Sequence, residues 1–207
     1  MNILLCAATE MEFGNPITSS SHKLDCFVTG VGLVQTAWRL SQKLHSYTPE
    51  LCIQIGIAGS FDPAITPGMV TLVQQDCFAD LGAQDRDGSF LHLTEILPCD
   101  NENPFERFYL RPEIPFIAIN LPMVNAISVN TVHGHQPEID QARSKFDAQI
   151  ESMEGASFFA VCISKNVPCL QIRSISNMVE PRNKSFWQIN LAIQNLHKEL
   201  AAIIEVL

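Results

Sequence analysis

The sequence predicts an α/β fold, in which helices cover both faces of one sheet in three layers. Two patterns predict this class. Short, continuously apolar runs alternate with longer segments of helical spacing along the chain, and such alternation favours a sheet packed between two layers of helices. Neither an internal repeat nor a linker divides the 207 residues. We therefore expect residues 1–207 to form a single domain.

The first half of the chain supplies four predicted strands and one helix. ILLCAA at 3–8 is apolar throughout and predicts a buried strand. LDCFVTGVG at 24–32 predicts a strand that ends at glycines, and the amphipathic segment at about 33–45 predicts the helix that follows. LCIQIGIAG at 51–59 predicts a strand that runs into a turn of small residues, and GMVTLVQQ at 68–75 predicts another.

The second half begins with residues 82–115, which are rich in Asp, Asn, Pro and Gly and predict a long irregular stretch. A loop of that length in a compact domain is often functional or mobile. Apolar runs predict further strands, and helical spacing predicts further helices, of which the last is the clearest. These elements are strands at 123–130 and 167–175, and helices at 136–146, 152–166 and 186–207.

Composition excludes several classes of function. The net charge of −9 gives no basic surface for nucleic acid or an anionic membrane. The seven cysteines are scattered and never form C-x-x-C, which indicates free thiols in a reducing cytosol. The N-terminus MNILLCAA lacks the positive charge of a signal peptide, and no apolar run is long enough to cross a bilayer. We expect a cytoplasmic protein.

Candidate functional groups follow the predicted strands. Ligands of open α/β sheets bind beyond the carboxyl ends of the strands. The groups at these ends are Glu10, Glu12, Gly30, Gly32, 56–59, Asn130, Thr131, Met153, Glu154, Ser176 and Asn177. Two carboxylates and an amide that converge on glycine turns suit a small polar ligand.

Each of these groups also has a purely structural explanation. Glu10 and Glu12 could form a solvated turn, and Glu154 could simply favour the start of a helix. GVG and GIAG could be tight turns, since neither is a complete dinucleotide-binding motif. The HGH at 133–135 is more typical of a polar loop than of a metal site, because no third ligand lies at a usual spacing.

Five motifs together carry a resemblance that covers nearly the whole chain. AATEMEF, GVG, GIAGSF, SMEGAS and RSISN occur in the order and spacing of the purine nucleoside phosphorylase/uridine phosphorylase superfamily. The chain is most similar to its hydrolytic branch, which includes the methylthioadenosine/S-adenosylhomocysteine nucleosidases. Within that branch, FADLGAQ, VNTVHG and RSISNMVEPRN with a later Trp resemble the futalosine hydrolases. The resemblance implies a nucleoside phosphorylase-like three-layer sandwich around a mixed central sheet.

The resemblance also implies roles for individual residues. Glu12 matches the glutamate that activates water, and Glu154 matches the glutamate that binds the ribose hydroxyls. Val132 stands where adenine-specific relatives stack a phenylalanine, and Ser152 stands where they have another glutamate. With Asn177 as the third catalytic candidate, the expected substrate-binding residues are Thr9, Val31, Ile57, Ala58, Gly59, Thr131, Val132, Met153, Ser176, Arg182 and Trp187.

The amide of Asn177 bears on the leaving group. Adenosine-cleaving relatives have an aspartate there, whose protonated form donates to N7 and whose other oxygen accepts from the 6-amino group. A 6-oxo purine such as hypoxanthine presents an acceptor at position 6, which an amide NH₂ can satisfy and a carboxylate cannot. We therefore expect hypoxanthine as the leaving group, and the alternative is an asparagine that only caps a turn.

Water is expected as the nucleophile. Phosphorylases carry an arginine in a glycine-rich turn after the first strand, whereas this chain has Glu12 there and would repel phosphate. The expected reaction is hydrolysis of futalosine to hypoxanthine and dehypoxanthine futalosine in the alternative menaquinone pathway, without cofactor or metal. The alternatives are a methylthioadenosine/S-adenosylhomocysteine nucleosidase and a non-catalytic nucleoside-binding protein. The family resemblance implies a homo-oligomer, and Arg182 is a candidate to bind the substrate's carboxylate.

Overall fold

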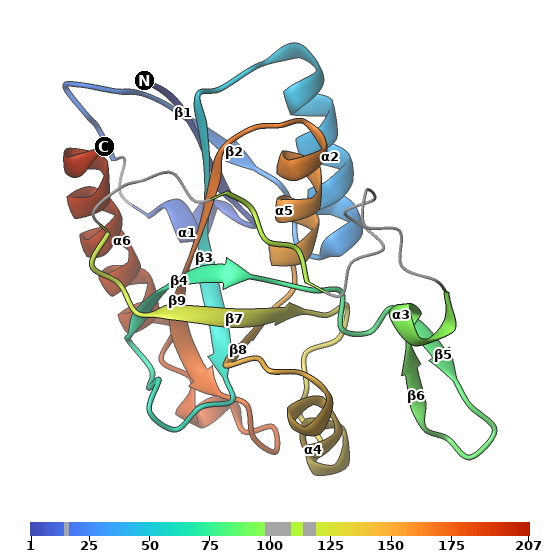
Figure 1. Cartoon of the computed structure of the whole chain (residues 1–207). Helices are drawn as coiled ribbons and strands as arrows, with labels where there is room; N and C mark the ends of the chain where they lie inside the picture. The colour runs from blue at the N-terminus through green and yellow to red at the C-terminus, as the bar shows by residue number, and fades with distance from the viewer. Residues whose placement is uncertain (15–16, 98–108, 114–118) are drawn as a thin grey trace.

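The computed structural model describes residues 1–14, 17–97, 109–113 and 119–207, which form the predicted α/β architecture (Figure 1). One mixed sheet has the strand order β2-β1-β3-β8-β7-β4-β9. Its strands are β1 (Asn2–Ala7), β2 (Lys23–Val28), β3 (Leu51–Ser60), β4 (Val70–Gln75), β7 (Met123–Ser128), β8 (Ile150–Ser152) and β9 (Cys169–Met178). The helices around it are α1 (Glu10–Phe13), α2 (Leu33–Ser46), α4 (Gln136–Lys145), α5 (Gly155–Ser164) and α6 (Ile189–Val206).

Strand β3 is the centre of this sheet. It pairs in parallel with β1 and β9, and antiparallel with β8. Strand β9 also pairs with β4, which leads through β7 back to β8. The sheet therefore closes on itself between β3 and β9, while β1 and β2 extend it as an open layer. Almost every residue of β3 and β9 is buried, including the polar residues Gln171 and Arg173 of β9.

Helices cover both sides of the layer formed by β1, β2 and β3. Figure 1 shows α6 on one side and α2 with α5 on the other. Helix α2 packs on α5, where Leu40 and Phe158 are fully buried in one core cluster. Helix α6 packs on β3, β4 and β9 through Leu196 and Leu200, which lie one helical turn apart in a second cluster. These two cores fix the carboxyl ends of the strands in place.

Residues 82–115, predicted to be irregular, contain regular structure in their first half. The turn between the two strands of a hairpin contains an Asp-Gly pair, with Gly88 at φ +89° and its N–H donating to the carbonyl of Asp85. Asp-Gly between strands is a known hairpin signal. Residues 98–108 and 114–115 of this stretch lie outside the described part of the chain. The elements are β5 (Gly82–Gln84), β6 (Phe90–His92) and the short helix α3 (Leu93–Ile96).

Two predicted helices begin later than expected. The segment from 152 was predicted as helical, but residues 150–152 form β8 and α5 begins at Gly155. A strand of three residues is too short for its periodicity to reveal it. The last helix begins at Ile189, after a single 3₁₀ turn, η2 (Lys184–Phe186). None of the helices in the described ranges has the length and apolar character needed to span a membrane.

Candidate active site

The ends of β1, β3, β8 and β9 surround a cavity of about 320 Å³. All three predicted catalytic residues, Glu12, Glu154 and Asn177, line this cavity. All but one of the predicted substrate-binding residues also line it: Thr9, Val31, Ile57, Ala58, Gly59, Val132, Met153, Ser176, Arg182 and Trp187. Residues far apart in the sequence therefore meet in one place, as the strand-end rule predicts.

Thr131 is the exception. It lines a neighbouring cavity of about 450 Å³, together with His133 of the same segment. Val132, between them, faces the first cavity. Neighbouring residues of the loop after β7 therefore face different cavities.

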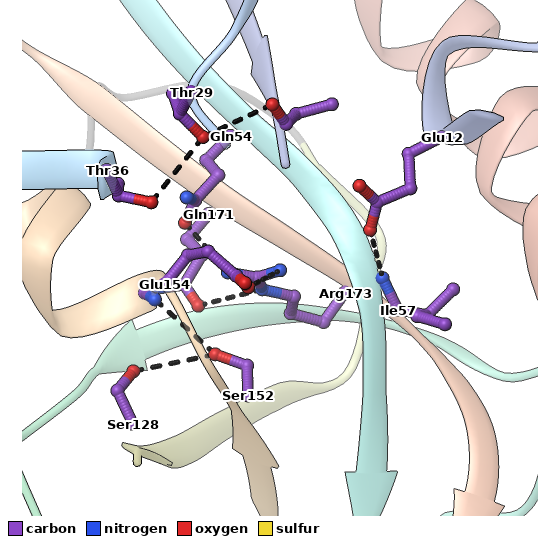
Figure 2. Close-up of polar contacts among 12 residues, drawn as sticks. Glu12, Thr29, Thr36, Gln54, Ile57, Ser128, Ser152, Glu154, Gln171 and Arg173 are labelled. Atoms are coloured by element: carbon purple, nitrogen blue, oxygen red, sulfur yellow. Dashed lines mark hydrogen bonds and ion pairs between the residues drawn. The ribbon is translucent and has the colours of Figure 1, made fainter. Parts of the chain in front are cut away.

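Glu12 lies on the short helix α1, directly after β1, and is 6% exposed. Its Oε2 accepts hydrogen bonds from the backbone N–H of Thr9 at 2.9 Å and from the Thr9 hydroxyl at 3.2 Å. Its Oε1 accepts from the backbone N–H of Ile57 on β3 at 3.3 Å (Figure 2). The backbone carbonyl of Glu12 is held by His197 of α6 at 2.8 Å. The carboxylate is therefore fixed in position and retains lone pairs that face the cavity.

Glu154 immediately precedes α5, whereas the predicted helix already included it, and its carboxylate lines the cavity. Its Oε1 accepts from the backbone N–H of Gly32 at 3.1 Å, and its Oε2 lies 3.6 Å from Nη1 of Arg173. Burial raises the pKa of Glu154, while the Arg173 charge and the Gly32 N–H act in the opposite direction. Besides any effect on the helix start, Glu154 thus forms an ion pair with an arginine on β9.

Arg173 is a residue of this site that the sequence reading missed. Its side chain is 1% exposed, and its guanidinium donates to Oε1 of Gln171 at 3.1 Å and to Oε1 of Gln54 at 2.8 Å. Gln171 in turn donates to Oδ2 of Asp76 at 3.2 Å. A fully buried chain of polar groups thus runs from Glu154 into the protein interior (Figure 2). The available signal was the polar pair Gln171 and Arg173, which are two residues apart in a strand and therefore lie on one face.

Gly56 on β3 leaves the space that this arrangement needs. It pairs with Arg173 across β3 and β9. A Cβ at this position would lie 2.4 Å from Nη1 of Arg173 and 2.9 Å from Oε1 of Glu12. Both distances are shorter than real Cβ contacts, so only glycine lets the two charged side chains approach β3 this closely.

Asn177 lies near the end of β9, where the β3–β9 pairing shifts register between Ala58 and Gly59. Its Oδ1 accepts from the hydroxyl of Ser176 at 2.8 Å, and its Nδ2 donates to the carbonyl of Met178 at 2.9 Å. These two contacts set the direction of the amide. The Nδ2 group has a second hydrogen, which is not needed for the bond to Met178.

Arg182 and Trp187 form one wall of the cavity. The guanidinium carbon of Arg182 lies 5.2 Å from the centre of the Trp187 ring, a cation–π arrangement. The backbone N–H of Arg182 donates to the carbonyl of Gly134 at 3.0 Å. This wall therefore presents an exposed cation beside an aromatic face.

Four further residues line the cavity without having been predicted to bind substrate: Ala8, Met11, Glu151 and Ser152. Glu151 is the most informative of them, since it adds a third carboxylate. Its carboxylate pairs with His133 of the HGH segment, whereas His135 pairs with Glu138. The described residues contain no group of three or more His, Cys, Asp or Glu side chains suited to a metal ion.

Comparison with protein families places this geometry in context. The family model of the phosphorylase superfamily matches residues 14–207. The chain is 25% identical over 179 residues to the futalosine hydrolase of Thermus thermophilus, covering 85% of this chain and 79% of that protein. It is 27% identical over 164 residues to the futalosine hydrolase of Streptomyces coelicolor, covering 76% of this chain and 66% of that protein.

A solved structure shares the fold over the whole chain. The MTA/SAH nucleosidase of Streptococcus pneumoniae, in complex with 8-aminoadenine, superposes with a TM-score of 0.81 at 18% identity. The match covers 100% of both chains. The mixed α/β fold with helices on both faces is therefore that of the nucleosidases.

Proposed function

Because the chain belongs to the phosphorylase superfamily, we propose that it is a nucleosidase that hydrolyses the N-glycosidic bond of futalosine and releases hypoxanthine. One observation carries the proposal. Glu12 and Glu154 are both buried in the wall of one cavity that also contains the amide of Asn177. The two futalosine hydrolases that match most of the chain support the choice of substrate.

Glu12 is the general base. Cleavage builds positive charge on the sugar, and the C–N electron pair leaves with the purine. The oxygen of a water molecule bonds to the anomeric carbon, and one of its protons passes to Glu12. A positioned general base contributes roughly 10²- to 10⁴-fold to a rate. The contacts from Thr9 and Ile57 hold the carboxylate for this step.

Glu154 binds the ribose hydroxyls and adds negative charge near the cationic sugar. For this it has to be ionised, although burial raises its pKa. Arg173 opposes that shift, because its guanidinium lies 3.6 Å from Oε2 of Glu154 and favours the carboxylate. We assign Arg173 a positioning role through Glu154.

Asn177 reads the 6-oxo group of the purine. Its Oδ1 is held by Ser176, so the NH₂ group is the part of the amide that is available to an acceptor. Negative charge that develops on the departing purine strengthens such a bond. An aspartate at this position would have to be protonated to act as a donor.

Water fits this cavity better than phosphate. Among the described residues that line it, Arg182 is the only cation, against the three carboxylates of Glu12, Glu151 and Glu154. An anionic nucleophile would be repelled by this balance. The same arginine, beside Trp187, suits the carboxylated aromatic arm of futalosine.

The test is to incubate the purified protein with futalosine and with methylthioadenosine, side by side, and to identify the purine released. Hypoxanthine from futalosine supports the proposal. Adenine from methylthioadenosine, with futalosine left intact, supports instead a methylthioadenosine/S-adenosylhomocysteine nucleosidase, whose fold this chain shares. Tight binding of either nucleoside without turnover supports a non-catalytic binding protein. Phosphate added to the assay distinguishes phosphorolysis from hydrolysis.

The wider setting is part of the same proposal. Release of hypoxanthine from futalosine places the enzyme in the alternative menaquinone pathway, and we expect it in the cytoplasm. We also expect a homo-oligomer, because Val31, Val34 and Trp38, at and near the start of α2, are large apolar residues that are 48%, 77% and 66% exposed. Val31 lines the cavity, so a second copy on this face would border the site.

A further inference from the structure

Glu151 is a buried carboxylate in the cavity wall to which the mechanism above gives no task. It lies in the middle of β8, is 3% exposed, and lines the cavity together with Glu12 and Glu154. A carboxylate in such a place is unfavourable unless its charge is compensated and its lone pairs are used. Its burial therefore depends on the groups that pair with it.

Within the described part of the chain, the partners of its carboxylate both belong to His133. The backbone N–H of His133 donates to Oε1 of Glu151 at 3.1 Å, and the Nδ1 of His133 lies 2.6 Å from Oε2. This pairing with Glu151 raises the pKa of His133. Each carboxylate oxygen has two lone pairs, and His133 uses one on each. The remaining lone pairs can accept hydrogen bonds from a ligand, and the ionised group offers no donor.

Glu151 and Asn177 lie on either side of Gly59. Gly59 pairs with Glu151 across β3 and β8, and with Asn177 across β3 and β9. A Cβ on Gly59 would lie 3.3 Å from Nδ2 of Asn177 and 3.6 Å from Cγ of Glu151. The amide of Asn177 and the side chain of Glu151 thus flank the same glycine, and both line the cavity.

This order of donor and acceptor matches one edge of a 6-oxo purine. Such a base presents the acceptor O6 beside the donor N1–H, whereas a 6-aminopurine presents a donor at N6 beside an acceptor at N1. We propose that Glu151 accepts a hydrogen bond from N1–H of the purine while Asn177 donates to O6, so that the two residues together select 6-oxo purines. The inference rests on the proposed function, which places the purine at Asn177.

The substitution Glu151→Gln tests the assignment with little change in shape. The backbone N–H of His133 keeps the amide oxygen as its acceptor, so the new NH₂ group turns toward Nδ1 and its second hydrogen faces the cavity. N1–H of hypoxanthine then faces another donor, whereas N1 of adenine can accept a hydrogen bond from the new NH₂ group. We expect the affinity for free hypoxanthine to fall at least about tenfold relative to that for adenine, measured by titration calorimetry.

The matched control is Glu138→Gln. Glu138 also pairs with a histidine, His135, but lies on the exposed face of α4 and does not line the cavity with Asn177. This variant should leave the ratio of the two affinities unchanged. If Glu151 only anchors the His133 segment, Glu151→Gln weakens both bases equally, and that result overturns the inference.

A second measurement does not depend on the stability of Glu151→Gln. 1-Methylhypoxanthine lacks the N1–H and carries a methyl group in its place. The unaltered protein should bind it at least about tenfold more weakly than hypoxanthine, and Glu151→Ala, which makes room at N1, should lose this discrimination. Equal binding of the two bases by the unaltered protein contradicts the inference.

These outcomes are separable from those of the proposed function. Free bases report on recognition without turnover. A protein that does not cleave futalosine, yet shows the Glu151-dependent preference for hypoxanthine, refutes the proposed reaction and leaves the base-reading role in place. A protein that cleaves futalosine but whose base preference is unaffected by Glu151→Gln supports the proposed reaction and refutes the role of Glu151.

Discussion

Glu12 has contacts that make its role testable with a conservative change. Glu12→Gln keeps the size of the side chain, and its amide oxygen can still accept from the N–H of Thr9. The variant should fold and bind nucleoside but lose at least about two orders of magnitude in kcat, because an amide is not a general base. Glu10→Gln, an exposed position on the same short helix, is the matched control and should retain full activity. Near-normal turnover of Glu12→Gln would remove Glu12 from the mechanism.

A substitution of Asn177 tests how the protein recognises the purine base. In Asn177→Asp the carbonyl of Met178, which now accepts from Nδ2, would face a carboxyl oxygen, so the introduced aspartate is favoured in its protonated form. That form has a single proton, which passes from the Met178 carbonyl to N7 when the purine binds, and its other oxygen can accept from a 6-amino group. The ratio of kcat/KM for futalosine to that for its 6-amino counterpart should fall at least about tenfold, or about 1.4 kcal/mol. Equal losses for both substrates would mean that Asn177 shapes the turn and does not read the base.

Arg182 tests the recognition of the substrate's carboxylate. If its guanidinium, held against Trp187, binds the anionic arm, Arg182→Ala should raise KM for futalosine several-fold and leave kcat nearly unchanged. The control is a neutral nucleoside that lacks the carboxylate, whose KM should be unaffected by the substitution. An unchanged KM for futalosine would show that the arginine is only a residue of an exposed loop.

At the scale of the element, the pairing of β3 with β9 brings two opposite charges beside one glycine. Gly56→Ala places a methyl group 2.4 Å from Nη1 of Arg173 and 2.9 Å from Oε1 of Glu12, so at least one of them must move. Overpacking of this kind typically costs about 1–3 kcal/mol. We expect a lower stability and at least a tenfold lower kcat/KM.

A control separates these two effects. Gly88→Ala is also strained, because Gly88 has φ +89°. Apart from Gly88 and its two chain neighbours, no described residue lies within 4 Å of the added methyl group, and the position is in the β5–β6 hairpin. Gly88→Ala should lower the stability by about 1–2 kcal/mol and leave kcat/KM unchanged. If both variants lose activity in proportion to stability, the charged pair around Gly56 has no special role.

At the scale of the whole molecule, the buried polar chain predicts how stability depends on pH. Burial raises the pKa of Asp76 from 3.8 to about 7, although Gln171 and Ser128 donate to its carboxylate and Arg173 lies nearby. Between these values the folded protein binds a proton that the unfolded chain has released. The stabilisation of the folded protein by this proton on Asp76 is therefore fully present below about pH 4 and is lost as the pH rises through 7.

The variant Asp76→Asn removes this proton. Relative to it, the unaltered protein should lose up to about 1.4 kcal/mol of stability for each pH unit between about 4 and 7. Urea unfolding of both proteins at several pH values measures the difference. Burial also raises the pKa of Glu154, but both proteins contain that residue, so the comparison isolates Asp76. Parallel pH curves would show that Asp76 does not titrate in this range.

By itself, the sequence determined the fold class, the order of most strands and helices, the family, and the presence of Glu12, Glu154 and Asn177 at the site. These depend on local patterns: apolar runs, helical spacing, and motifs within a few residues of a strand end. Apart from Thr131, the predicted site residues lie around one cavity for that reason. The Asp-Gly turn at 87–88 was local too, and could have revealed the hairpin.

Only the tertiary structure decided which buried groups meet. The contact of Arg173 with Gln54 joins residues 119 positions apart, and that of Gln171 with Asp76 joins residues 95 apart. The placement of Glu151 and Asn177 on either side of Gly59 depends on strand register, where a shift of one residue reverses a side chain. Local periodicity does not encode pairing between distant strands, because that pairing is selected by the packing of the whole sheet.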